Sequence, residues 1–176
     1  TAWCALIEAQ IAIERGEVDT GLYRLDEALA LGEALALKDL LGQAWTLLLE
    51  AAVQKGSPRE AERAIRGQKI LGEPGPQSHW NGALAKWEWM TGNVGEALRL
   101  CEKAPKGYAG ARIHAEKCRL LLISGQIEKS VRAARKLKSH TEEWGMTELA
   151  LFADLIISAG SKLDDKQVAP LLRRCN

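Results

Sequence analysis

Apolar residues recur along this chain at spacings of three and four, between polar stretches dominated by Glu, Lys and Arg. This spacing places apolar side chains on one face of an α-helix, and the commonest residues, Ala and Leu among them, favour helices. Alternating runs of Val, Ile, Thr and Tyr, which would indicate β-strands, are absent from the sequence. We therefore predict an all-α fold. The pattern predicts helices at residues 2–15, 20–38, 40–55, 58–71, 77–91, 94–104, 108–124, 127–140, 146–159 and 164–174.

The glycines that we expect to end helices recur at a nearly constant spacing. Gly16, Gly56, Gly92, Gly125 and Gly160 are separated by 40, 36, 33 and 35 residues. Glycine just past a helix adopts the left-handed conformation that satisfies the last carbonyl groups without a Cβ clash. Repetition at such a period is typical of helical solenoids. We expect one repeat domain over residues 1–176, with five helix pairs at 1–38, 39–73, 76–105, 107–143 and 145–176.

Two further positions of each pair hold mostly small residues. Five residues after the glycines stand Gly21, Ala61, Ala97, Ser130 and Asp165. Seven residues before them stand Ala9, Leu49, Ala85, Cys118 and Ala153. Small side chains at one fixed point in each helix would let the two helices of a pair approach closely.

This spacing resembles the tetratricopeptide repeat (TPR) family, most clearly at residues 80–104, where Gly92 and Ala97 fall in register. The family's aromatic residue near the start of the first helix is replaced there by Asn81, and its bulky tyrosine-like position by Glu88. The resemblance implies a right-handed superhelix of helical hairpins. Residues 25–49 are also similar in composition to the helical superhelix domains of MalT-like and LuxR-type bacterial regulators.

The TPR resemblance also implies a concave groove lined by the first helix of each pair. The lining positions lie thirteen, ten, six and three residues before the closing glycine, and they include the apolar residues Trp3, Leu6 and Ile13. We take their polar, charged and aromatic members as candidate partner-binding residues: Gln10, Gln43, Thr46, Glu50, His79, Lys86, Trp89, Arg112, Arg119 and Asp154. The basic members among them would attract an acidic peptide segment in a salt-dependent manner.

The tryptophans of the third pair divide between two helix faces. Trp80 and Trp87 share a stripe that we expect to pack in the core. Trp89 is turned by about 200° from Trp87 around the helix. It is therefore either an anchor for a partner or packing for the adjacent pair.

The sequence offers few residues or motifs that would indicate catalysis or metal binding. The three histidines are isolated, and no nucleophile, phosphate-binding or dinucleotide motif is present. We expect no enzyme activity and no cofactor, and His114 with Cys118 offers too few ligands for a metal site. The four cysteines, Cys4, Cys101, Cys118 and Cys175, are interpreted as small buried residues of a protein in the reducing cytoplasm.

Charge is distributed unevenly although the net charge is only +1. Residues 1–88 hold nine Lys/Arg and thirteen Asp/Glu, a balance of −4, whereas residues 89–176 hold fifteen and ten, a balance of +5. Residues 99–138 alone contain eleven Lys/Arg and three Asp/Glu. Nucleic-acid-binding domains carry more overall positive charge, so we interpret this segment as a solvated helix face. The apolar runs are also too short to span a membrane.

Two functional hypotheses follow. The first is a non-catalytic interaction module that holds a peptide segment or partner domain in the groove. The alternative is the sensor or regulatory domain of a larger signalling protein, such as a MalT-like transcriptional regulator, in which the groove binds a small effector. The domains that flank this segment would separate the two hypotheses.

Overall fold

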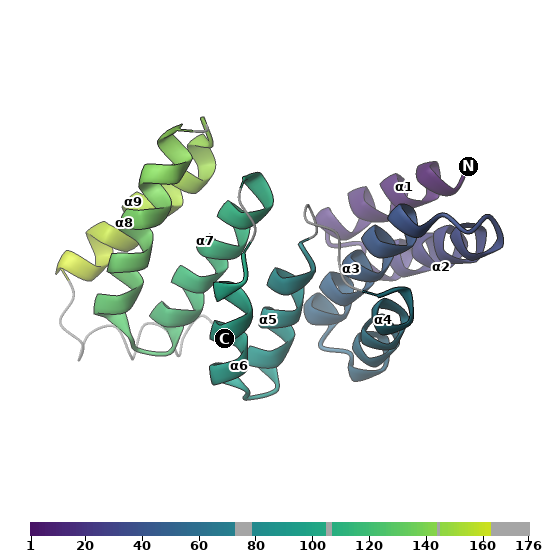
Figure 1. Cartoon of the computed structure of the whole chain (residues 1–176), viewed down its shortest axis with the longest axis horizontal. Helices are drawn as coiled ribbons and strands as arrows, with labels where there is room; N and C mark the ends of the chain where they lie inside the picture. The colour runs from purple at the N-terminus through teal and green to yellow at the C-terminus, as the bar shows by residue number, and fades with distance from the viewer. Residues whose placement is uncertain (73–78, 105–106, 144, 163–176) are drawn as a thin grey trace. The chain divides into compact units, whose positions relative to one another are not determined.

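The computed structural model describes residues 1–72, 79–104, 107–143 and 145–162, and every regular element within them is an α-helix (Figure 1). This confirms the predicted all-α class. The helix expected at residues 164–174 lies outside the described residues. The helices are α1 (Ala2–Glu14), α2 (Val18–Ala34), α3 (Lys38–Lys55), α4 (Pro58–Leu71), α5 (Trp80–Met90), α6 (Val94–Glu102), α7 (Tyr108–Ile123), α8 (Ile127–Glu143) and α9 (Thr147–Lys162).

Four of the five glycines predicted to end helices do so with positive φ angles. These angles are 81° at Gly16, 66° at Gly56, 91° at Gly92 and 75° at Gly125. The prediction is wrong for Gly160, because α9 continues through it to Lys162. A Cβ atom on Gly160 would overlap the Val131 side chain of α8. Glycine is therefore required there by close packing of two helices and not by a turn.

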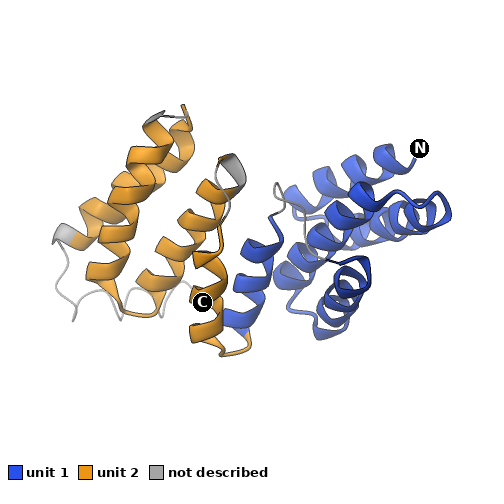
Figure 2. Cartoon of the chain, in the orientation of Figure 1, with its two compact units in different colours: residues 1–90 blue, residues 91–176 orange. Residues whose placement is uncertain are grey.

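The chain forms two compact units, residues 1–90 and 91–176, coloured blue and orange in Figure 2. In the first unit, each of α1 to α3 packs against the next helix, and α3 also contacts α1 and α5. In the second unit, each of α6 to α8 packs against the next helix, and α7 also contacts α9. The assembly of successive pairs into a single superhelix stays a prediction.

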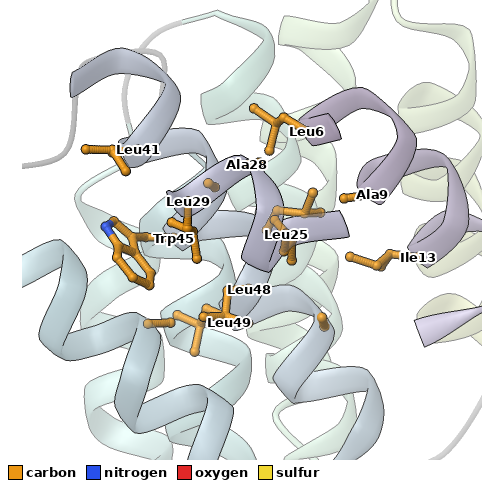
Figure 3. Close-up of a cluster of buried hydrophobic side chains, with 14 of the residues drawn as sticks. Leu6, Ala9, Ile13, Leu25, Ala28, Leu29, Leu41, Trp45, Leu48 and Leu49 are labelled. Carbon is orange, nitrogen blue, oxygen red and sulfur yellow. The ribbon is translucent and has the colours of Figure 1, made fainter. Parts of the chain in front are cut away.

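The core of the first unit is built where α1, α2 and α3 meet (Figure 3). Leu25 of α2 and Leu48 and Leu49 of α3 are completely buried there. Trp45, also on α3, is buried against α4, where a Cβ atom on Gly67 would overlap the indole ring. The small size of Gly67 thus lets a large aromatic side chain fill the space between two helices.

The two series of small residues are buried wherever the structure describes them, as predicted. They are Ala9, Gly21, Leu49, Ala61, Ala85, Ala97, Cys118, Ser130 and Ala153. Members of the two series also face each other across a pair. The Ser130 hydroxyl donates a hydrogen bond of 2.7 Å to the Cys118 carbonyl oxygen, and a Cβ on Gly21 would lie 3.2 Å from the Ala9 carbonyl oxygen. Asp165, the remaining member, lies outside the described residues.

Replacing Gly67 with Ala tests the packing of α3 on α4. The added methyl group would overlap the buried Trp45 ring, so we expect the free energy of unfolding to fall by about 1–3 kcal/mol. Gly42→Ala is the matched control, because a Cβ there would be in ordinary contact, 3.6 Å from Leu71 Cδ2. The better helix propensity of Ala should leave that variant as stable as the parent or more stable by up to about 1 kcal/mol. Urea unfolding followed by circular dichroism measures the free energy of unfolding of both variants. Equal changes in the two variants would contradict the close packing of α3 on α4.

Candidate functional site

Seven of the candidate groove residues lie in the first unit. They are carried by α1, α3 and α5 and by the residue just before α5, and α3 contacts both of the other helices. Their exposure differs: Gln10 and Gln43 are exposed, Glu50, His79, Lys86 and Trp89 are half-buried, and Thr46 is buried. The structure therefore brings the three carrier helices together but does not expose all of the candidate side chains.

Thr46 is not part of an open surface, contrary to the expectation from the groove register. Its side chain is 7% exposed, and its hydroxyl donates a 2.8 Å hydrogen bond to the Gly42 carbonyl oxygen of its own helix. Leu6 and Ile13 are also buried, because this side of α1 packs into the core of the first unit. The expected lining stripe is thus partly a core stripe in α1 and α3.

The exposed face of α1 carries an apolar row, of which the groove register predicted Trp3 but not Ile7 or Ile11. Trp3 is 42% exposed, Ile7 54% and Ile11 43%, and the three residues follow one another at intervals of four. Gln10 is exposed beside them and donates a 2.9 Å hydrogen bond to Glu14. The spacing of four residues could have revealed this row in the sequence. It was not recognised because α1 carries a second apolar stripe, which includes Ala5 and Ala9. We call Trp3, Ile7 and Ile11 the α1 row.

The third pair's tryptophans lie largely as expected. Trp80 is buried, and Trp87 packs against the core cluster of the first unit, which confirms the core interpretation for both. Trp89 is half-buried. Both roles considered for Trp89, anchor and packing residue, are compatible with that intermediate exposure.

The other three candidates, Arg112, Arg119 and Asp154, lie in the second unit. Arg112 and Arg119 are exposed on α7. Arg119 pairs with Glu116, at 3.0 Å from its Nε and 2.6 Å from its Nη2 to the same oxygen. Asp154 of α9 accepts a 2.6 Å hydrogen bond from the Lys138 ammonium of α8. The charges of Arg119 and Asp154 are therefore already compensated on the protein surface.

The cysteines follow the prediction only in part. Cys101 and Cys118 are buried as unpaired thiols, and burial raises the pKa of each to about 12. Cys4 is exposed, so the expectation of burial is wrong there. It lies in the first turn of α1, where its backbone N–H donates to the Thr1 hydroxyl at 3.3 Å. Cys175 lies outside the described residues.

Among the described residues, no group of three or more His, Cys, Asp or Glu side chains is arranged to hold a metal ion. None of the described helices is long and apolar enough to cross a membrane. Comparison of the chain with protein-family models, with curated proteins and with solved structures finds no significant match.

Thiol labelling should separate the three described cysteines. With a pKa of about 12, Cys101 and Cys118 have only about one thiolate in ten thousand molecules at pH 8. We expect iodoacetamide to label exposed Cys4 first, and to reach the two buried thiols only after unfolding or as the pH approaches 12. Peptide mapping by mass spectrometry follows each site separately. Labelling of Cys101 or Cys118 as fast as Cys4 in the folded protein would show that the second unit opens readily.

Proposed function

We propose that the chain is a non-catalytic interaction module that binds a partner protein, or a peptide segment of one, on the exposed face of its first helices. The observation that carries this proposal is the α1 row. Contiguous exposed apolar side chains mark interaction sites on soluble proteins, and large aromatic and aliphatic anchors supply most of the binding energy at such sites.

Burial of the α1 row by a partner would be favourable. Each of its three side chains keeps between 42% and 54% of its surface exposed. Complete burial of such a side chain contributes about 1.5–3 kcal/mol, so covering the exposed half contributes about 1 kcal/mol per residue. Three neighbouring residues with this property supply the apolar centre of a small interface.

Polar groups surround the α1 row in the way that a polar rim surrounds an interface centre. Gln10 lies beside the row, and Glu14, which accepts its hydrogen bond, follows Ile11 by three residues on the same helix face. Glu8 lies on the other side, where its carboxylate is 3.1 Å from Arg24 of α2. These groups are exposed and satisfied on the protein, so they can stay at the edge of a contact without desolvation.

The α1 row is also held rigidly. The opposite side of α1 is fixed in the core by Leu6, Ala9 and Ile13, and the Thr1 hydroxyl caps its first turn. A preorganised helix loses little conformational entropy when a partner binds. A small effector, by contrast, is usually enclosed in a concave pocket, whereas the α1 row lies on an open helix face. These features favour a protein partner over the effector of the alternative hypothesis.

The side chains of α3 and α5 would extend the contact within the first unit. Gln43 is exposed on α3, and Lys86 and Trp89 are half-buried on α5. Lys86 would attract an acidic stretch of the partner. Unpaired Cys101 and Cys118 suit a reducing compartment, so we expect the partner to be encountered in the cytoplasm.

Site-specific cross-linking in the source cell tests this proposal. A photo-reactive amino acid in place of Ile7 should capture a discrete partner, whereas the same group in place of Tyr23, which is 70% exposed on α2, should not. In titrations of that partner, Trp3→Ala should weaken binding by about tenfold or more, as expected for an anchor. Tyr23→Ala should change affinity by less than about twofold, because scattered exposed residues contribute little.

Melting curves of the variants provide the control for folding. Trp3→Ala should leave the melting temperature close to that of the parent, because the side chain is already substantially exposed. Equal cross-linking at both positions, or equal loss of affinity in both variants, would contradict the proposal. Saturable binding of a small molecule that protects Ile7 without any captured protein would favour the sensor alternative.

A further inference from the structure

Four cationic or titratable side chains gather where α7 packs on α8. His114 and Lys117 belong to α7, and Lys136 and His140 belong to α8. The centroids of the two imidazole rings are 6.3 Å apart, and Lys136 and Lys117 both act electrostatically on His114. We call these four residues the α7–α8 cluster.

The α7–α8 cluster is separate from the groove candidates on the same helix. Successive residues turn by about 100° around a helix, so His114 lies about 160° from Arg112, and Lys117 lies about 160° from Arg119. The cluster therefore occupies the opposite face of α7. A ligand bound there would not compete with a partner that contacts Arg112 or Arg119.

The two sides of α8 differ in how their positive charges are compensated. On the side toward α9, Lys138 lies 2.6 Å from Asp154 and 3.7 Å from Glu142. On α7, Lys117 pairs with Glu102 of α6 at 3.2 Å. Among the side chains that the structure describes, no carboxylate lies within salt-bridge distance of Lys136, His114 or His140. Lys136 therefore has no salt-bridge partner among the described side chains, whereas Lys117 is paired with Glu102.

This arrangement has a cost for the protein alone. His114 is half-buried, and its pKa is lowered by burial first and then by the positive charges of Lys136, His140 and Lys117. Its imidazole therefore lies in the positive field of Lys136, His140 and Lys117. A bound anion would offset the repulsion between these groups.

We propose that the α7–α8 cluster binds a phosphate group. A phosphate monoester carries a charge of about −1.5 to −2 at pH 7. This is more negative charge than a carboxylate would bring to the Lys136 ammonium and to Lys117, which already shares its charge with Glu102. Its oxygens can accept hydrogen bonds from several directions, and the cluster presents Lys and imidazole donors from two helices. The phosphate could be borne by a phosphorylated side chain or by a nucleotide, which share this chemistry.

Binding should be coupled to proton uptake by His114. An anion beside the ring opposes the positive charges of Lys117 on α7 and of Lys136 and His140 on α8, so the pKa of His114 rises. A group whose pKa rises on binding takes up a proton, and affinity therefore increases as the pH falls from 8 toward about 6. Below about pH 6 the phosphate itself becomes protonated, and affinity should decline.

The test uses inorganic phosphate as the probe, with nuclear magnetic resonance of the imidazole Cε1 protons as the readout. At a constant ionic strength of about 0.15 M, phosphate should shift the His114 and His140 signals saturably and raise the pKa of His114 by about one unit, which corresponds to a tenfold coupling. Sodium chloride at the same ionic strength should not reproduce these shifts. Shifts that fail to saturate, or that chloride reproduces, would overturn the proposal.

Two variants of adjacent residues identify the binding groups. Lys136→Gln should weaken phosphate binding about tenfold, the effect expected for one charged hydrogen bond. Arg135→Gln also removes an exposed cation from α8. Arg135 points about 100° away from Lys136 around the helix, so the affinity for phosphate should stay within about twofold of the parent. Melting curves show whether both variants remain folded. Equal weakening by the two substitutions would show that only the general positive field of the unit acts, against the proposal.

Phosphoserine and AMP distinguish the sources of the phosphate. Tighter binding of phosphoserine than of inorganic phosphate supports a phosphorylated protein, and tighter binding of AMP supports a nucleotide. Equal affinities support recognition of the phosphate group alone. Binding of AMP without any binding of phosphate or phosphoserine would overturn the proposal, because the base would then provide the recognition.

Discussion

Close approach of paired helices is the constraint on which both units depend. Gly21 leaves no room for a Cβ against Ala9 and Ile13, and Ser130 reaches the Cys118 carbonyl oxygen across the corresponding pair in the second unit. With small residues at these points, the helix backbones come close enough for larger apolar side chains to fill the remaining space on both sides. The leucines of α2 and α3 occupy that space in the first unit.

The close approach of paired helices also determines which apolar residues stay exposed to water. A helix that packs through small residues uses one arc of its circumference, and any apolar residue outside that arc stays in water. In α1 the buried arc contains Ala5, Ala9 and Ile13, while Ile7 and Ile11 lie outside it. The α1 row is therefore a direct result of the way the first pair is packed.

The sequence predicted the helices and the small-residue contacts because both follow from local periodicity. A glycine marks a helix end reliably where the backbone has a positive φ angle, because few other residues adopt that conformation. Gly56 and Gly92 are examples. Gly160 misled the prediction because glycine also serves close packing, and the spacing alone does not distinguish the two uses. Thr46 was wrongly assigned to the groove because a polar residue type does not by itself indicate exposure. Its hydroxyl donates a hydrogen bond within its own helix and needs no contact with water. The α7–α8 cluster could not be predicted because it joins residues from two helices whose relative rotation depends on tertiary packing.

The unequal compensation of charge along α8 has a consequence for how the second unit responds to salt. Attraction between Lys138 and Asp154 holds α8 to α9, whereas repulsion within the α7–α8 cluster opposes the contact of α8 with α7. Added salt weakens both interactions because their groups are partly exposed, and the Debye length falls to about 10 Å at 0.1 M salt. Salt therefore weakens the attraction between α8 and α9 and also weakens the repulsion between α8 and α7. As salt is added, the contact of α8 with α9 becomes less stable, and its contact with α7 becomes more stable.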